Sequence, residues 1–377
     1  MIVVLGAGIA GVTAAHFLKE AGEEVLLVDR SDVPASGGSG AAGAFVSPKI
    51  GRGGPLQELT NDAFAFAKDF YRKLTPHAFH ADGVLRIPKN PEDEAKFESY
   101  EAFNYRPYER WDAVKAREAG LRDVPGGFFF PEAGDGDARE ICRTLAAGVP
   151  RRQMNVERLE RKEDRWLLHG PQERIEAERL VLATGYESGL LDLRYLGIKG
   201  LWGSRGDYAT SRHFPISMHK DFSLSSSREG RVKLGATHVK SPEPCRACDG
   251  RPLASLEAKA AEITDTSDFR LLETFCGMRS TSRDHFPVVG PVIDVPRMLE
   301  ESPAIVRGAK APLIHFEGLY LLNGLGGRGF VFAPLMARML AEHITRGAAL
   351  DRRIHPDRLF WKWVRRVGQQ RDERGEK

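Results

Sequence analysis

A glycine-rich turn near the start of the chain constrains the fold more than any other feature. Residues 1–5 form an apolar run of strand length, and Gly-Ala-Gly-Ile-Ala-Gly follows directly at 6–11. A helical pattern begins at once, and a second apolar run at 24–28 ends at Asp29, 18 residues past the last glycine. This is the G-x-G-x-x-G fingerprint in the strand–turn–helix–strand setting that dinucleotide binding requires. The sequence therefore predicts a Rossmann-like unit at this end of the chain.

Each glycine of this turn has a distinct expected role. The first glycine permits the tight turn, the second lets the backbone approach a pyrophosphate, and the third lets helix and strand pack closely. The N-terminus of the helix adds partial positive charge beside the phosphates. We expect Asp29 to accept hydrogen bonds from a ribose hydroxyl. The expected contacts from the turn itself are Gly6, Ala7, Gly8, Ile9, Ala10 and Gly11.

A second glycine-rich turn, at residues 323–330, lies more than 300 residues after the first. It follows an apolar run at 318–322 and precedes a helical pattern from about 329 to 344. An NAD dehydrogenase would complete its nucleotide domain within about 150 contiguous residues. If both turns belong to one domain, the late helix directs its N-terminus at the other end of the ligand, where a reduced flavin carries negative charge. The spacing therefore favours FAD over NAD, although a simple tight turn into a packing helix is the alternative.

The order of elements indicates an α/β flavoprotein of two domains. An amphipathic helix is expected at 56–74, and short strands follow Val156 until a strand ends in Ala-Thr-Gly at 183–185, as in glutathione-reductase-type flavoproteins. Residues 190–315 contain strand-like runs and few long helices. The expected FAD-binding domain is discontinuous and comprises 1–80, 126–190 and 316–346. The expected sheet-based substrate domain comprises 81–125 and 191–315, and 347–377 form a basic C-terminal tail.

The charge balance excludes a generally basic nucleic-acid-binding protein, because 55 Lys and Arg face 52 Asp and Glu. From Arg346 onward, however, ten Lys and Arg stand against five Asp and Glu. This tail also contains Phe360, Trp361 and Trp363, so it could lie against nucleic acid or form an ordinary solvated end. Residues 1–18 are apolar but are interrupted by three glycines and lack a charged leader. We therefore expect a cytoplasmic protein without a membrane segment.

A pair of cysteines, Cys245 and Cys248, has the spacing of half a zinc site. The remaining cysteines are isolated, and no histidine pair stands at ligand spacing. We therefore expect no metal.

Five segments together resemble the D-amino-acid-oxidase-type flavoproteins, which include glycine oxidase and sarcosine oxidase. Within that group the chain is most similar to the FAD domain of the bifunctional tRNA 5-methylaminomethyl-2-thiouridine biosynthesis proteins, over nearly its whole length. The most specific segment is Gly-Met-Arg-Ser-Thr-Ser-Arg-Asp-His-Phe-Pro-Val-Val-Gly at 277–290. The other segments are GGSGAAGAFVSPKI at 37–50, LTNDAFAFAKDFY at 59–71, LNGLGGRGFVFAPL at 322–335 and IHPDR at 354–358. The chain departs from the family at Ala41 and Ala42, where an Asn and a basic residue are usual.

The resemblance implies FAD-dependent oxidative cleavage of the 5-carboxymethylaminomethyl group of the wobble uridine in tRNA. The products would be the 5-aminomethyl base and glyoxylate, with dioxygen as the electron acceptor. Because the chain starts at the flavin fingerprint, a free-standing oxidase without the methyltransferase half is expected. Two alternatives stay open: an oxidase of small amines of the glycine, sarcosine or D-amino-acid type, and a flavin-containing tRNA-binding protein without activity.

The resemblance also implies roles for individual residues. Arg279 would bind the substrate carboxylate in a bidentate manner, Arg328 would lie near the flavin ring or the substrate, and Lys49 would favour oxygen activation. His285 would make a structural hydrogen bond. The further expected cofactor contacts are Arg30, Ser39, Gly40, Val156, Thr184, Gly185, Gly324, Gly326, Gly327, Arg328 and Gly329.

Overall fold

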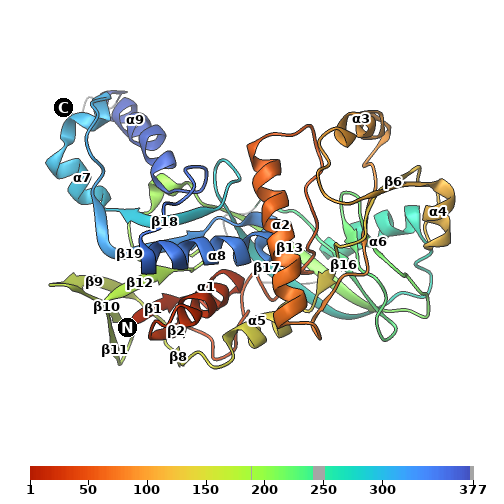
Figure 1. Ribbon diagram of the computed structural model, residues 1–377, viewed down its shortest axis with the longest axis horizontal. Helices are drawn as coiled ribbons and strands as arrows, with labels where there is room; N and C mark the ends of the chain where they lie inside the picture. The colour runs from red at the N-terminus through yellow and green to blue at the C-terminus, as the bar shows by residue number, and fades with distance from the viewer. Residues whose placement is uncertain (188, 241–250, 374–377) are drawn as a thin grey trace.

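The computed structural model describes residues 1–187, 189–240 and 251–373, and in this part of the chain the strands form two large sheets (Figure 1). The first is a six-stranded sheet, in which the five strands from β19 to β8 run parallel and β18 pairs antiparallel with β19 at one edge. Its strands, in spatial order, are β18 (Val288–Ile293), β19 (His315–Asn323), β12 (Arg179–Leu182), β1 (Ile2–Leu5), β2 (Val25–Asp29) and β8 (Arg151–Gln153).

The second is an eight-stranded, mostly antiparallel sheet at the right in Figure 1. Its long central pair, β13 and β17, runs antiparallel from Lys199 opposite Thr281 to Ala209 opposite Arg270. In spatial order its strands are β17 (Arg270–Thr281), β13 (Lys199–Ala209), β16 (Arg231–Gly235), β15 (Ser223–Leu224), β14 (Ser217–His219), β4 (Val84–Arg86), β6 (Gly126–Phe130) and β5 (Glu109–Asp112).

Smaller elements complete the described part of the chain. A meander of β9 (Arg158–Lys162), β10 (Arg165–His169) and β11 (Arg174–Ala177) covers one face of the six-stranded sheet, and β3 (Phe79–His80) pairs with β7 (Asp135–Gly136). The α-helices are α1 (Ile9–Glu20), α2 (Pro55–Leu74), α3 (Pro91–Glu101), α4 (Ala113–Glu118), α5 (Ala138–Ala146), α6 (Arg251–Ile263), α7 (Val295–Glu301), α8 (Gly329–Arg346) and α9 (Asp357–Glu373). The 3-10 turns are η1 (Arg194–Leu196), η2 (Pro303–Arg307) and η3 (Gly326–Arg328).

Side-chain alternation along β1 explains the layers around the six-stranded sheet. Ile2 and Val4 enter a core shared with α1, α2 and α8, whereas Val3 and Leu5 enter a second core shared with the meander and α9. A strand that is buried on both faces needs apolar residues at every position. The continuous apolar run at the start of the sequence therefore follows from this central place in the sheet.

The two glycine turns that are more than 300 residues apart in sequence lie side by side. Helices α1 and α8 pack against each other, and a Cβ added at Gly329 would stand 3.3 Å from Cγ2 of Ile9. The α/β architecture of two sheets agrees with the fold class expected from the sequence.

Two strands differ from the expected division of the chain. β6, within 126–190, pairs with β4 and β5 in the eight-stranded sheet, because Phe128 to Phe130 fill the cores of that region. β18, within 191–315, joins the six-stranded sheet through β19, where Val288 and Val289 are fully buried. β6 therefore belongs to the eight-stranded sheet although its segment was expected in the FAD-binding domain, and β18 belongs to the six-stranded sheet although its segment was expected in the substrate domain.

The C-terminal segment is a docked helix rather than a solvated tail. Leu359, Phe360 and Val364 of α9 are buried in the second core, and the rings of Phe360 and Tyr195 lie 5.8 Å apart. Trp361 and Trp363, which were candidates for nucleic-acid contact, are partly buried against the same core. The aromatic residues of this segment thus anchor the helix, because their spacing places them on its apolar face.

Candidate functional site

A cavity of 1210 Å³ extends between the two sheets. The carboxyl ends of parallel strands β1, β2 and β12 open onto it through Leu5, Asp29 and Ala183, which is where ligands bind in open α/β sheets. From the other side, β13 and β17 contribute Gly203 and Arg279. The cavity is larger than the roughly 300–1,000 Å³ that a drug-sized ligand occupies, so it can hold an extended dinucleotide together with a substrate.

Most of the residues expected from the sequence meet at this cavity. Those that line it are Gly6, Gly8, Ile9, Ala10, Asp29, Arg30, Ser39, Lys49, Val156, Thr184, Gly185, Arg279, Gly326, Gly327, Arg328 and Gly329. Ala7, Gly11, Gly40 and Gly324 do not line it. These four shape the backbone behind the lining: a Cβ at Gly40 would stand 2.0 Å from the carbonyl oxygen of Ala35, and Gly324 has a φ of +72°.

The N-terminal turn has room only for glycine at its first and third positions. A Cβ at Gly6 would stand 2.4 Å from the carbonyl oxygen of Ala183, and one at Gly11 would stand 1.7 Å from that of Gly6. The N-cap residue of α1 is Gly8, which has no side chain that could cap the helix. Instead, Ser39 Oγ accepts a hydrogen bond from the backbone N–H of Ile9 at 2.9 Å. The loop at 36–43 thus closes over the N-terminus of α1, the expected pyrophosphate site.

The Asp29 carboxylate holds the turn in place. Its Oδ2 accepts a hydrogen bond from the backbone N–H of Ala7 at 2.6 Å, and its Oδ1 accepts one from Ser31 at 2.8 Å. Because each carboxylate oxygen has a second lone pair, Asp29 can still accept a ribose hydroxyl. The structure thus gives Asp29 a role in the turn that the spacing alone did not indicate.

The late glycine turn is tied to the end of β12 and to the loop before α2. The Asn323 side chain donates to the carbonyl oxygen of Gly185 at 2.7 Å and accepts from the N–H of Gly324 at 2.7 Å. Arg328 Nη1 donates to the carbonyl oxygen of Ser47 at 3.2 Å. Burial lowers the pKa of Arg328 to about 10, so it stays a cation at neutral pH.

Arg279 extends from β17 into the cavity across a glycine of the neighbouring strand. Its Nη1 donates to the carbonyl oxygen of Thr237 at 3.2 Å, and burial lowers its pKa. A Cβ on Gly203 of β13 would stand 2.3 Å from Nη1 of Arg279. Gly203 therefore leaves the space in which the guanidinium lies. Sequence reasoning missed Gly203, and only the β13–β17 register reveals it.

Lys49 lies among other cations at the cavity. Burial lowers its pKa, and Arg328, Arg86 and Lys89 lower it further. Arg86, at the end of β4, also lines the cavity, and its Nε has no hydrogen-bond partner among the described residues. Burial and Arg328 bring the pKa of Arg86 to about 9, against a smaller opposing effect of Asp93. We call Lys49, Arg86, Arg279 and Arg328 the cavity cations.

Arg205 on β13 is a further cavity residue that the sequence did not reveal. It donates to the carbonyl oxygen of Ala42, forms a 3.0 Å ion pair with Asp207, and lies 4.0 Å from the ring centre of Phe275. These contacts fix the glycine loop against the eight-stranded sheet. Cys245 and Cys248, the candidate half of a zinc site, lie outside the described residues.

The residues present fit FAD. The α1 N-terminus and the closely packed glycines provide for a pyrophosphate at one end, and the α8 N-terminus with Arg328 provides for the anionic edge of a reduced flavin at the other. One continuous cavity joins these two ends. When bound, FAD would supply the hydride acceptor, and Arg279 would lie at the substrate side.

The comparison with protein families matches residues 1–343 to the family described as FAD dependent oxidoreductase. Among curated proteins, the chain is 28% identical over 384 residues to the tRNA 5-methylaminomethyl-2-thiouridine biosynthesis bifunctional protein MnmC of Marinobacter nauticus. This match covers 95% of the chain and 58% of that protein, so the chain spans little more than half of its relative. The MnmC protein of Magnetococcus marinus is 25% identical, with 95% of the chain and 59% of that protein covered.

Solved structures share the fold at lower identity. Iminodiacetate oxidase from Chelativorans superposes with a TM-score of 0.77 at 18% identity, covering 94% of this chain and 99% of that one. Glycine oxidase from Bacillus cereus gives a TM-score of 0.75 at 20% identity, covering 92% and 95%. Among the described residues, no helix has the length and apolar character needed to cross a membrane.

Proposed function

The chain belongs to the FAD-dependent oxidoreductase family, and from that premise we propose that it cleaves the 5-carboxymethylaminomethyl group of the wobble uridine in tRNA. The group is a secondary amine that carries a carboxymethyl arm, in effect a glycine joined through its nitrogen. Similarity to the MnmC proteins over 95% of the chain supports this choice of substrate. Dioxygen would be the electron acceptor, and the proposed location is the cytoplasm.

The Arg279 guanidinium carries the proposal. It lines the cavity, its Nη1 has a backbone carbonyl as partner, and no described carboxylate forms an ion pair with it. A buried guanidinium with donors still available is suited to bind a carboxylate in a bidentate manner. Held in this way, the carboxymethyl arm would place its C–H bond at the flavin, which is the positioning that the reaction requires.

The reaction balances with FAD, water and dioxygen. When bound, FAD would supply the acceptor for the hydride of the carboxymethyl carbon next to nitrogen, and the amine would lose a proton while Arg279 holds the carboxylate. Water then hydrolyses the C=N bond, which gives the 5-aminomethyl base and glyoxylate. Dioxygen takes up the electron pair and two protons and leaves as hydrogen peroxide. In this proposal Arg279 holds the carboxylate throughout, and Lys49 favours the reduction of dioxygen by its charge.

The excess of cavity cations supports an anionic substrate larger than an amino acid. Besides Arg279, the cavity contains Lys49, Arg86 and Arg328, and the charge of Arg328 lowers the pKa of both Lys49 and Arg86. Among the described residues, Asp93 is the one carboxylate that appreciably raises the pKa of Arg86. With the FAD pyrophosphate at the α1 end of the cavity, one substrate carboxylate and one flavin anion leave part of the positive charge of these four cations uncompensated. A nucleotide with flanking phosphates would compensate it.

A small N-substituted glycine is the second candidate substrate, because Arg279 can bind the same carboxylate on a free amino acid. The test is the product analysis of tRNA that carries the modified uridine after incubation with the FAD-loaded protein and dioxygen. We expect glyoxylate in the supernatant and 5-aminomethyluridine in the nuclease digest. Unchanged tRNA together with glyoxylate from glycine or sarcosine would assign the small-amine activity, and no product from either would assign a non-catalytic role.

A further inference from the structure

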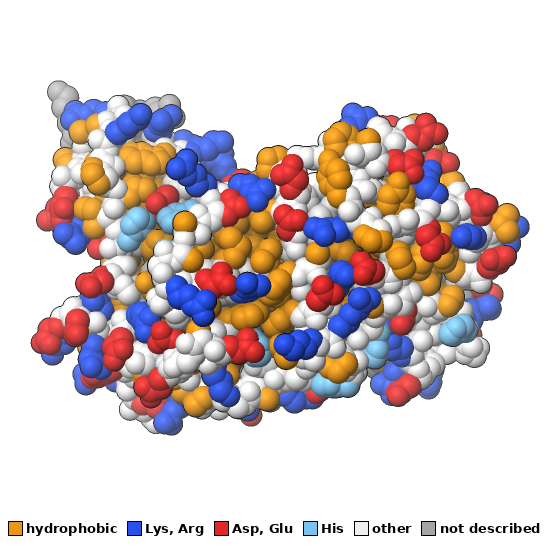
Figure 2. Space-filling view, viewed as in Figure 1, with side chains coloured by type: hydrophobic (Ala, Val, Ile, Leu, Met, Phe, Trp, Pro, Cys, Tyr) orange, Lys and Arg blue, Asp and Glu red, His pale blue; other side chains and the backbone are white. Residues whose placement is uncertain are grey.

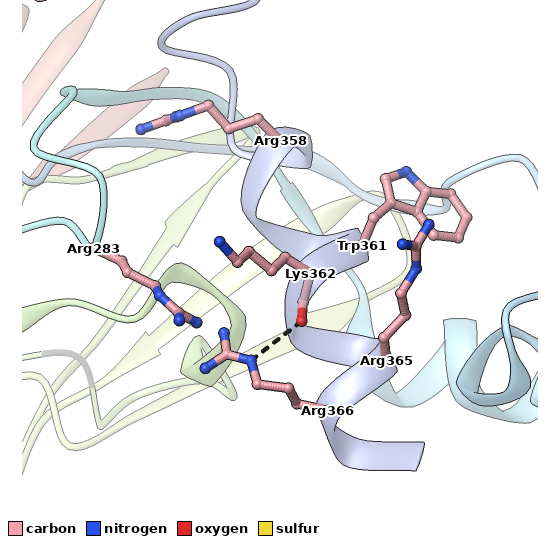
Figure 3. Close-up of a pocket in the computed structure, with 6 residues that line it drawn as sticks. All are labelled: Arg283, Arg358, Trp361, Lys362, Arg365 and Arg366. Carbon is pink, nitrogen blue, oxygen red and sulfur yellow. Dashed lines mark hydrogen bonds between the residues drawn. The ribbon is translucent and has the colours of Figure 1, made fainter. Parts of the chain in front are cut away.

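A basic hollow of 480 Å³ lies on the surface between α9 and the segment that joins β17 to β18 (Figure 3). Its lining residues are Arg283, Arg358, Trp361, Lys362, Arg365 and Arg366. Five of these six side chains are cationic and none is acidic. In Figure 2, Lys and Arg side chains gather over α9 at the upper left of the molecule. The chain thus concentrates positive charge on one side of a helix whose other side is buried.

Arg358 is the structural member of this group. Its Nε donates to Asp284 Oδ2 at 2.8 Å and its Nη2 to Asp284 Oδ1 at 3.0 Å. Its Nη1 donates to the carbonyl oxygens of Ile354 and His355. The segment at 277–290 and the segment at 354–358 are therefore joined by this bidentate pair. Arg358 holds α9 against the loop that carries Arg283.

The other cations are held close together without compensating carboxylates. Arg283, Lys362 and Arg365 are exposed, and none of them forms an ion pair with a described residue. Lys362 and Arg366 are four residues apart on the helix, and Arg366 Nε donates to the carbonyl oxygen of Lys362 at 3.3 Å. Figure 3 shows Arg283 extending toward this pair. Like charges at this spacing destabilise a helix unless an anion lies between them.

The basic hollow is close to the rim of the cavity. Thr281 and His285 line the cavity, and Arg283 stands two residues from each along the chain. Two residues span at most about 7 Å of backbone. An extended anion that enters the cavity with one group can therefore reach the basic hollow with the next.

We propose that Arg283, Lys362, Arg365 and Arg366 form the docking surface for the sugar–phosphate backbone of the RNA that presents the oxidised nucleoside. This inference rests on the proposed function. Arg365 and Arg366 lie three and four residues after Lys362, so the three form a row of cations on one helix face. Phosphate contacts to such a row position an RNA without reading its sequence. In this proposal the cavity binds the modified group of the nucleoside, and the docking surface contributes affinity for the RNA backbone.

The test replaces Arg283, Lys362 and Arg365 by glutamine in the full FAD-loaded chain. The matched control replaces three exposed cations on other elements by glutamine: Arg117, Lys162 and Arg231. Binding of tRNA with the 5-carboxymethylaminomethyl uridine is measured at several salt concentrations. The rate of flavin reduction by the free 5-carboxymethylaminomethyl nucleoside, which has no phosphate, reports on the cavity alone.

We expect the triple variant to bind tRNA at least tenfold more weakly than the control. The slope of log affinity against log salt should fall by about 2 to 3, because three phosphate contacts are lost. Flavin absorbance and reduction by the nucleoside should match those of the wild type. Wild-type affinity and salt slope in the triple variant, or equal losses in the control, would overturn the docking surface while leaving the proposed function intact. A wild-type protein that neither binds nor oxidises this tRNA would overturn both.

Discussion

The cavity and the α9 surface both concentrate cations, but the chain holds them in different ways. In the cavity, Arg279 and Arg328 are partly buried and each donates to one backbone carbonyl. At the α9 surface, Arg358 is engaged in structural hydrogen bonds, whereas Lys362 of α9 and Arg283 of the adjoining β17–β18 loop are exposed to solvent. Buried cations with few partners suit one small anion in a fixed place, and exposed cations suit a polyanion whose contacts are screened by salt. The comparison separates recognition of the reacting group from recognition of the molecule that carries it.

The largest expected effect is a loss of stability when the packing of α9 against the second core is removed. Phe360 is fully buried, so Phe360→Ala removes a ring from the second core and should lower the free energy of unfolding by about 3–5 kcal/mol. Denaturant unfolding followed by circular dichroism measures it. Lys362→Ala, next to it on the exposed face, should change the value by less than about 0.5 kcal/mol. Equal midpoints for wild type and Phe360→Ala would show that α9 is not docked.

The next largest expected effect is a loss of activity when the Arg279 guanidinium is removed from the cavity. Arg279→Ala should lower kcat/KM for the modified tRNA roughly 30-fold to several-thousand-fold, because a charged hydrogen-bond partner of the carboxylate is lost, at about 2–5 kcal/mol. The protein should stay yellow, since Arg279 is expected to bind substrate rather than FAD. Arg279→Lys should recover part of the activity. Loss of flavin absorbance in Arg279→Ala would place this residue at the cofactor instead.

A smaller effect sharpens the role of Gly203. Gly203→Ala should lower kcat/KM about tenfold, because the new methyl group would occupy the space of the Arg279 guanidinium and shift it. If Gly203 acts through Arg279, the double variant with Arg279→Ala should be no less active than Arg279→Ala alone. Additive losses in this cycle would contradict that relation. Steady-state kinetics of the four proteins provide the measurement.

The smallest effect concerns the pH dependence of α9 docking. Burial alone would raise the pKa of Asp357, but hydrogen bonds from His315 and His355 outweigh it and bring the pKa down to about 2 from 3.8. A depressed carboxyl pKa stabilises the fold above about pH 4, and this contribution is lost as the pH falls toward 2. After allowance for solvent screening, we expect a loss of about 1–2 kcal/mol across this window. Asp357→Asn should flatten this part of the stability curve, and an unchanged curve would contradict the assignment.

The sequence predicted the features that depend on local pattern. The strands at β1, β2, β12 and β19, the helices α2 and α8 and the meeting of the two glycine turns follow from apolar runs and glycine spacing. The cavity gathers most of the predicted cofactor residues because turns at the ends of neighbouring parallel strands necessarily lie together.

The features that sequence reasoning missed depend on pairing between distant segments. Gly203 gains its role only from its place opposite β17, and Arg86 from the position of β4 beside β14. Of the two interpretations of the C-terminal segment, the solvated end was wrong, because composition shows the charge of the segment but not which face of α9 packs against the second core. Helical spacing of Phe360 and Val364 was the available signal.

The central claim is that the cavity accepts the modified nucleoside of tRNA in preference to a free amino acid. Anaerobic bleaching of the bound flavin tests it most directly, with tRNA carrying the 5-carboxymethylaminomethyl uridine compared with glycine, sarcosine and D-alanine. We expect the tRNA to bleach the flavin at micromolar concentrations at which the three amino acids leave it oxidised, since only the tRNA can use both groups of cations. Bleaching by any of these amino acids with comparable efficiency would contradict the claim.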